Sequence, residues 1–258
     1  MRPILFNIGP FPVHAYGLLL AAGFITALTV AARRASRRGL SADSIQSLGL
    51  TALLCGILGA RAAYVGLNWD FFRWALWEIP RLDHGGLVFY GGLIGGALGV
   101  LWKIWRLKLP LGMTLDLLTP ALALGHAFGR VGCFLNGCCY GKPTDGPWGM
   151  VFFHGDSPRH PTQLYEMTAL IVLFLFLSRL EGRPHRPGSV FWSYGLLYGA
   201  WRFGIEFLRG DNPIWSGLTS FQWISIPLMG LSAAALLWLR RREPAADGRS
   251  GTHPKDRS

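Results

Sequence analysis

The sequence predicts an all-α integral membrane protein. Of its 258 residues 51% are hydrophobic and only 15% are charged, whereas an ordinary soluble domain has roughly 25% charged residues. The apolar residues occur in long runs that are separated by short charged clusters, and such runs have the length of membrane-spanning helices. The composition also excludes disordered, collagen-like and disulfide-scaffold classes.

A membrane-spanning helix needs about 20 mostly apolar residues. Seven segments meet this condition: residues 13–32, 45–67, 86–104, 115–134, 163–180, 189–207 and 220–239. We therefore expect about seven transmembrane helices in one polytopic domain, residues 1–242. The positive charge of the first segment follows its apolar run, so we expect that segment to be a retained helix and not a cleaved signal peptide. Residues 243–258 are polar, which predicts a disordered cytoplasmic tail.

The basic residues predict how these helices are oriented. In a soluble protein the net charge of +11 would suggest nucleic acid, but in a membrane protein Lys and Arg of short loops stay on the cytoplasmic side. Six basic residues lie on the side of the N-terminus, against thirteen on the other side. The thirteen are Arg33, Arg34, Arg37, Arg38, Lys103, Arg106, Lys108, Arg179, Arg183, Arg186, Arg240, Arg241 and Arg242. We expect the N-terminus outside, the C-terminus in the cytoplasm and no nucleic-acid partner.

Three arginines fall inside or at the end of predicted spans: Arg61, Arg130 and Arg202. An arginine near the bilayer centre costs at least about 2.5–3.5 kcal/mol, so each needs a partner. Arg202 and Glu206 are four residues apart, which places them on one helix face where they can pair. Glu166 lies one turn inside the fifth span, and we expect it to meet Arg61, Arg130 or Arg202.

Two stretches are rich in glycine. Residues 126–141 carry four glycines around Arg130 and Asn136, which predicts a poor helix with unwound backbone and favours an anion site over simple packing. Two guanidiniums at membrane depth would suit a phosphate. In residues 85–96 the spacing of small residues is more typical of a tight helix contact.

Three of the four cysteines, Cys133, Cys138 and Cys139, fall near the outer face, whereas Cys55 is expected to be a buried apolar residue. A disulfide that joins Cys133 to Cys138 or Cys139, and packed free thiols, are both open. A catalytic thiol is less favoured, and a metal site would need a fourth ligand.

Over roughly residues 8–242 the chain resembles the prolipoprotein diacylglyceryl transferase family of bacterial inner-membrane enzymes. The resemblance rests on five motifs in order: His14-Ala15-Tyr16-Gly17; Gly85-Gly86 through Gly91-Gly92-Leu93-Ile94-Gly95; Gly129-Arg130-x-Gly132 with Phe134-x-Asn136-Gly137; His160-Pro161-x-Gln163-Leu164-Tyr165-Glu166; and Tyr198-Gly199-x-x-Arg202 with Glu206-Phe207-x-Arg209.

The resemblance implies transfer of the diacylglyceryl group of phosphatidylglycerol to the lipobox cysteine of a prolipoprotein, with release of glycerol phosphate. It implies an active site toward the outer face of the inner membrane, with phosphatidylglycerol, lipobox peptides and membrane lipids as partners. No metal or other cofactor is expected. A diverged paralogue with another acceptor, a transporter of an anionic or lipid substrate, and a noncatalytic lipid-binding scaffold are the alternatives.

The resemblance also implies site residues. The expected catalytic residues are Arg130 and Arg202, which would bind the phosphate, Glu206, which would hold Arg202, and Tyr90. The expected substrate-binding residues, besides Arg130, are Asn136, Gly141, Tyr16, Tyr198, Gly91 and Gly92. The chain departs from the commoner family pattern because Tyr90 replaces a histidine, and Cys133 and Cys138 replace an asparagine and a glutamate. The group that deprotonates the thiol is therefore left open.

Overall fold

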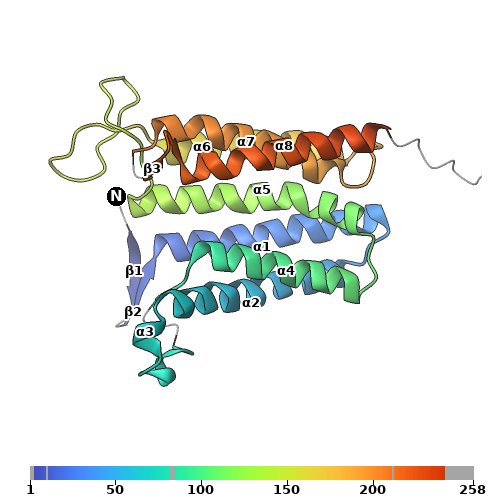
Figure 1. Ribbon diagram of the computed structural model, residues 1–258, viewed down its shortest axis with the longest axis horizontal. Helices are drawn as coiled ribbons and strands as arrows, with labels where there is room; N and C mark the ends of the chain where they lie inside the picture. Colours follow the sequence, from blue (N-terminus) through green and yellow to red (C-terminus); the bar gives the residue numbers. More distant parts are fainter. Residues whose placement is uncertain (1–2, 10, 82–84, 211, 242–258) are drawn as a thin grey trace, which may run out of the picture.

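The computed structural model describes residues 3–9, 11–81, 85–210 and 212–241, and it is a bundle of long helices that lie side by side (Figure 1). The seven longest helices in these residues are α1 (Ala15–Ala35), α2 (Ala42–Leu67), α4 (Phe89–Arg106), α5 (Leu111–Asn136), α6 (Thr162–Glu181), α7 (Ser189–Ile205) and α8 (Ser220–Arg241). Each overlaps one predicted span, so the helical fold class is confirmed. The tail expected at residues 243–258 lies outside the described residues.

Five of these helices, α1, α2, α5, α6 and α8, are long and apolar enough to cross a membrane. Only 17% of the most apolar window of α1, and 17% of that of α8, is buried inside the protein. Large apolar side chains such as Ile25, Leu58 and Leu231 instead point outward with more than 60% of their surface exposed. Apolar surface on this scale is stable in lipid and not in water, so the chain is a membrane protein.

Short elements join the long helices. At the end of the bundle where the N-terminus lies, which we call the hairpin end, are two antiparallel hairpins and a short helix (Figure 1). These are β1 (Ile4–Ile8) with β2 (Phe11–His14), β3 (Ile214–Trp215) with β4 (Leu218–Thr219), and α3 (Trp69–Phe72). The 3-10 turns are η1 (Ser36–Arg38), η2 (Leu76–Glu78) and η3 (Glu206–Leu208).

The other end of the bundle, which we call the basic end, collects positive charge. The last turns of α1, α4, α6 and α8 all carry basic residues: Arg33, Arg34, Lys103, Arg106, Arg179, Arg240 and Arg241. Glu181 of α6 pairs there with Arg38 at 2.8 Å. Asp116 of α5 accepts hydrogen bonds from the backbone N–H of Gly188 at 2.6 Å and of Phe191 at 2.8 Å, and so caps the start of α7.

Helices α2 and α4 touch through glycines. A Cβ atom on Gly59 would lie 2.4 Å from the carbonyl oxygen of Gly91, and one on Gly95 would lie 2.5 Å from that of Cys55. Only glycine permits backbones to approach this closely. The tight contact predicted for residues 85–96 is confirmed.

The expectation of unwound backbone in residues 126–141 is wrong for residues 126–136. Helix α5 is continuous through Gly129 and Gly132 and ends at Asn136. A Cβ on Gly132 would lie 3.0 Å from the ring of Tyr16 in α1, so packing against α1 outweighs the low helix propensity of glycine. The irregular backbone begins at Gly137, which has a φ of 70° and ends the helix.

The α2–α4 contact leads to a prediction about stability. Gly59→Ala should lower the free energy of unfolding in detergent by about 1–3 kcal/mol, because the new methyl group meets backbone atoms that must move. Gly66→Ala in the same helix is the matched control, since a Cβ there has no atom of the described structure within 4 Å. Equal unfolding midpoints for the two variants would contradict the prediction.

Candidate active site

Glu166, in the second turn of α6, is the centre of a buried charge cluster at the hairpin end. Its side chain is fully buried and contacts three guanidiniums. Arg130 of α5 lies 2.9 Å from Oε1, and Arg202 of α7 and Arg209 after η3 each lie 3.5 Å from Oε2. One carboxylate therefore joins α5, α6, α7 and the segment that follows η3.

Glu206 provides the second carboxylate of the cluster. Its Oε2 atom lies 3.0 Å from Arg202 and 4.0 Å from Arg209, and its Oε1 accepts a hydrogen bond from Asn212. The pairing of Arg202 with Glu206 predicted from their spacing is present. Three guanidiniums facing two carboxylates leave one formal positive charge in a nearly dry environment, which favours binding of an anionic group such as phosphate.

Aromatic rings border this cluster. The guanidinium carbon of Arg202 lies 4.2 Å from the ring centre of Phe221 in α8, and Tyr90 of α4 stacks on the same ring with centres 6.2 Å apart. The hydroxyl of Tyr198 donates a hydrogen bond to Glu166 at 3.5 Å. The ring of Phe221 thus lies between Tyr90 and Arg202, and 41% of the surface of Tyr90 remains exposed.

The other predicted substrate-binding residues lie in two places. Gly141 follows α5, where a Cβ would be 2.6 Å from the carbonyl oxygen of Leu208, so glycine allows this segment to pass beside η3. Tyr16 packs against Gly132 at the end of α5, whose last residue is Asn136. Gly91 and Gly92 face α2, and a substrate-binding role for them stays a prediction.

Arg61 does not take part in the cluster. It is buried and donates to the carbonyl oxygens of Ile79 at 2.8 Å, Glu78 at 2.6 Å and Gly85 at 2.8 Å. Of the three partners expected for Glu166, the structure therefore places Arg130 and Arg202 there and uses Arg61 to hold the segment before α4.

Arg209 is the cluster residue to which the sequence analysis assigned no role, although it closes the motif Glu206-Phe207-x-Arg209. It lies beyond the sixth predicted span and was counted among the loop charges on the outer side. Its spacing of three residues from Glu206 was the signal available. The fold buries its side chain, which is 5% exposed, because Arg209 pairs with Glu166 of α6 and its backbone bridges to Gly141 after α5.

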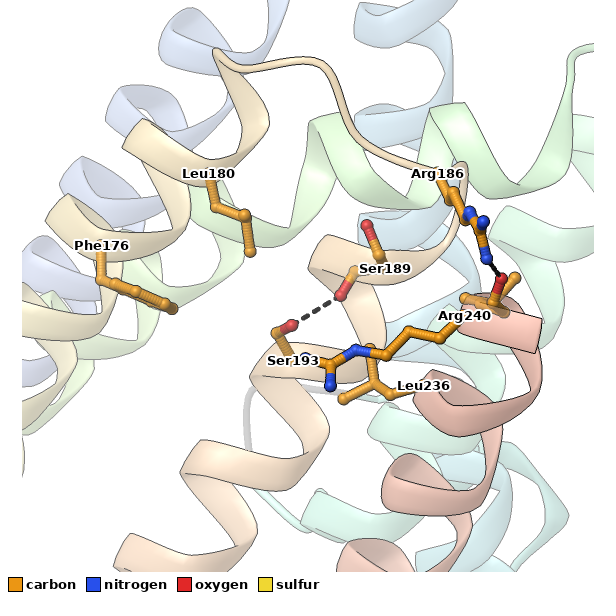
Figure 2. Close-up of a pocket in the computed structure, with 8 residues that line it drawn as sticks. Phe176, Leu180, Arg186, Ser189, Ser193, Leu236 and Arg240 are labelled. Atoms are coloured by element: carbon orange, nitrogen blue, oxygen red, sulfur yellow. Dashed lines mark hydrogen bonds between the residues drawn. The ribbon is translucent and has the colours of Figure 1, made fainter. Parts of the chain in front are cut away.

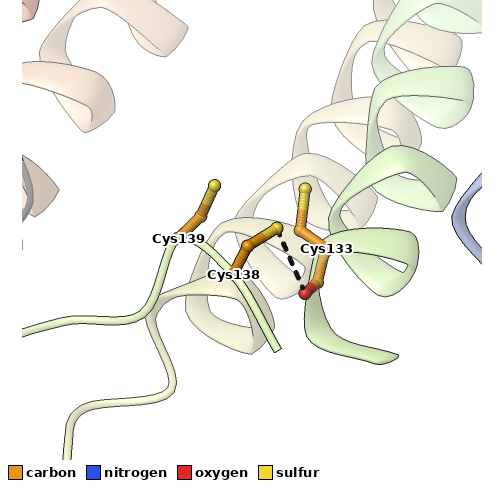
Figure 3. A group of neighbouring side chains, drawn as sticks. All are labelled: Cys133, Cys138 and Cys139. Carbon is orange, nitrogen blue, oxygen red and sulfur yellow. Dashed lines mark hydrogen bonds between the residues drawn. The ribbon is translucent and has the colours of Figure 1, made fainter. Parts of the chain in front are cut away.

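Three thiols lie close together at the end of α5 (Figure 3). Cys133 lies in the last turn of α5, Cys138 and Cys139 follow it, and all three are free and half-buried, as is Cys55. No disulfide joins them in the described structure. Hydrogen bonding to Cys133 and to the Arg209 guanidinium lowers the pKa of the Cys139 thiol, although burial opposes the shift.

A pocket separate from the charge cluster lies at the basic end. Its cavity of about 350 Å³ is lined by apolar side chains such as Phe176 and Leu180 together with Arg186 and Arg240 (Figure 2). Arg186 donates to the carbonyl oxygen of Leu239. None of the residues predicted for the site lines this pocket.

The fold and the charge cluster define a helical membrane protein with a buried cationic site suited to an anionic headgroup. Residues 3–238 match the family model described as prolipoprotein diacylglyceryl transferase, and the chain belongs to this family.

Three relatives are named phosphatidylglycerol–prolipoprotein diacylglyceryl transferase. The protein of Clostridium tetani is 35% identical over 82% of this chain and 86% of its own length. The protein of Chromohalobacter salexigens is 36% identical over 96% of this chain and 95% of its own length. The protein of Geobacter sulfurreducens is 38% identical over 94% of this chain and 97% of its own length. The transferase interpretation is thereby favoured over a transporter or a lipid-binding scaffold.

The cluster predicts a strong effect for Glu166→Gln. Loss of the shared carboxylate charge leaves three buried guanidiniums with one partner, which should lower the free energy of unfolding by about 3–5 kcal/mol. Chemical denaturation in detergent measures it. Asp70→Asn removes an ion pair whose carboxylate is 92% exposed and should leave stability unchanged. If both variants unfold at the same denaturant concentration, Glu166 does not organise the cluster.

Proposed function

We propose that this protein transfers the diacylglyceryl group of phosphatidylglycerol to the lipobox cysteine of prolipoproteins and releases glycerol phosphate. The proposal rests on family membership and on one structural observation: three guanidiniums share two buried carboxylates at the hairpin end. The excess positive charge suits the phosphate of an anionic lipid. The exposed apolar side chains of the surrounding helices suit contact with acyl chains within the bilayer.

The reaction requires a nucleophile and a leaving group on opposite sides of one carbon. The acceptor thiolate attacks the glycerol carbon that bears the phosphate, a C–S bond forms, and the C–O bond breaks with its electrons going to the phosphate oxygen. Negative charge grows on that oxygen as the bond breaks. Guanidiniums already oriented toward it stabilise this charge without reorganisation.

Arg130 and Arg202 are the proposed phosphate ligands. The Nε atom of Arg130 is buried and has no hydrogen-bond partner among the described residues, so it can donate to a phosphate oxygen. Glu206 holds Arg202 in position at 3.0 Å. We assign Tyr90 and Tyr198 to the walls of the site, and Tyr16, Asn136 and Gly141 to its outer side, where the acceptor peptide would approach.

We also propose how the protein lies in the membrane. All seven long helices cross the bacterial inner membrane within one domain, the N-terminus and the hairpin end face outward, and the basic end faces the cytoplasm. The basic last turns of α1, α4, α6 and α8 support this orientation. The charge cluster would then open toward the side from which exported prolipoproteins arrive.

Substitution of the proposed phosphate ligands should abolish transfer. Arg130→Lys and Arg202→Lys keep the charge but lose the planar pair of donors, so the rate should fall at least about 100-fold. The assay supplies phosphatidylglycerol vesicles and a lipobox peptide and measures thioether product and glycerol phosphate. Arg183→Gln, in the exposed segment after α6, is the control. Wild-type rates in both lysine variants, with unchanged folding, would show that Arg130 and Arg202 are not the phosphate ligands.

Reporter fusions test the orientation. Alkaline phosphatase fused after Ser157, between α5 and α6, should be active because that segment lies outside. The same enzyme fused after Arg183, between α6 and α7, should be inactive, while a fluorescent protein there should fluoresce. The reverse pattern would contradict the orientation, and equal activity at both positions would contradict a crossing by α6.

A further inference from the structure

The thiols of Cys133, Cys138 and Cys139 form a compact group. Their three sulfur atoms all lie within 4.8 Å of one another (Figure 3). In a tetrahedral site with metal–sulfur bonds of about 2.3 Å, sulfur atoms are about 3.8 Å apart. Small side-chain rotations would therefore bring all three to one ion.

The backbone that carries these thiols is held from outside the group. The side-chain amide of Gln163 donates to the carbonyl oxygen of Cys138 at 2.6 Å, and the hydroxyl of Thr162 donates to that of Cys139 at 2.9 Å. Gln163 and Thr162 are fully buried at the start of α6. Cys139 itself has a φ of 64°. Residues other than glycine adopt this left-handed conformation only where their surroundings impose it. These contacts orient the thiols in advance, as in a built site.

We propose that Cys133, Cys138 and Cys139 bind one soft divalent cation such as Zn²⁺ and leave a fourth coordination position for the acceptor thiol. Thiolates select soft cations, and three protein ligands with one open position are the arrangement of catalytic zinc sites. The role of the open position rests on the proposed function. It also adds a metal where the sequence led us to expect none.

The neighbouring charges suit a metal bound by three thiolates. Such a centre with Zn²⁺ carries one negative charge, and the positively charged guanidinium of Arg209 lies next to Cys139. A disulfide is the competing outcome. It would require two sulfurs at about 2.05 Å and would leave the third without a role.

The metal would supply the missing step of the reaction. A free thiol is only a few per cent thiolate at pH 7, and a thiol bound to zinc is deprotonated outright. The acceptor thiol would bind the open position and lose its proton to water. That thiolate would then form the C–S bond while the C–O bond to phosphate breaks, and glycerol phosphate would leave with the electron pair. No oxidant or reductant is consumed.

Metal binding is tested first and without any activity assay. The full-length protein is purified in detergent with a phosphine reductant, dialysed against zinc, and analysed for zinc per chain; Co²⁺ replaces zinc for spectroscopy. We expect one equivalent and an intense sulfur-to-cobalt charge-transfer band. Cys133→Ser, Cys138→Ser and Cys139→Ser should each weaken binding at least tenfold. Cys55→Ser, in α2, should bind like the wild type. No zinc, zinc retained by the triple serine variant, or an obligate disulfide would overturn the site.

Activity then tests the open position. Chelation should lower the transfer rate to a lipobox peptide at least tenfold at pH 7, and added Zn²⁺ should restore it. At pH 9 the peptide thiol ionises by itself, so the deficit should narrow, whereas a purely structural metal would leave the deficit unchanged. Equal rates with and without zinc at pH 7 would also overturn this role. If the zinc-loaded protein forms no thioether at any pH, the proposed function fails instead, while the metal site stands on its own measurement.

Discussion

The burial of Glu166 among three arginines is the interaction on which the hairpin end depends. A lone carboxylate or guanidinium at that depth would be strongly unfavourable, and each becomes tolerable only because the others are present. The four groups come from α5, α6, α7 and the segment after η3. These ion pairs therefore hold the ends of the four elements at fixed positions relative to one another. Apolar packing in the bundle is nondirectional and could not do so as sharply.

Close backbone contacts support this arrangement from two sides. Gly132 lets α1 approach the last turns of α5, and Gly141 lets the following segment lie against Leu208 and His160. The backbone N–H of Lys142 donates to the carbonyl oxygen of Leu208 at 2.7 Å, next to Arg209. A side chain at Gly141 would meet Leu208, His160 and Thr162, so the segment after the cysteines would have to move. The glycines of this motif therefore allow close packing around the site and are not needed to make the backbone flexible.

The sequence predicted the long helices well because lipid imposes a simple rule on length and hydropathy. It also predicted the Arg202–Glu206 pair, whose geometry is local to one helix. It assigned no role to Arg209 because burial there depends on contacts with residues far away in the sequence, Glu166 of α6 and Gly141 after α5. It misassigned the glycines of α5 because helix propensity is a weak preference, and contact with Tyr16 decides the outcome. The partners of Arg61 are backbone carbonyls, and a sequence pattern of charges does not reveal them.

The proposed reaction needs two things from the site: stabilisation of the departing phosphate and activation of the incoming thiol. Guanidiniums can stabilise a departing phosphate directly, but two carboxylates already absorb most of their field, so they offer the incoming thiol little help. A phenol has a reference pKa near 10 and stays protonated at neutral pH, so Tyr90 is a poor base there. Activation of the nucleophile therefore calls for a separate group close to the phosphate ligands. Among the described residues the three cysteines meet that condition, since Cys139 lies next to Arg209 and Cys133 shares α5 with Arg130.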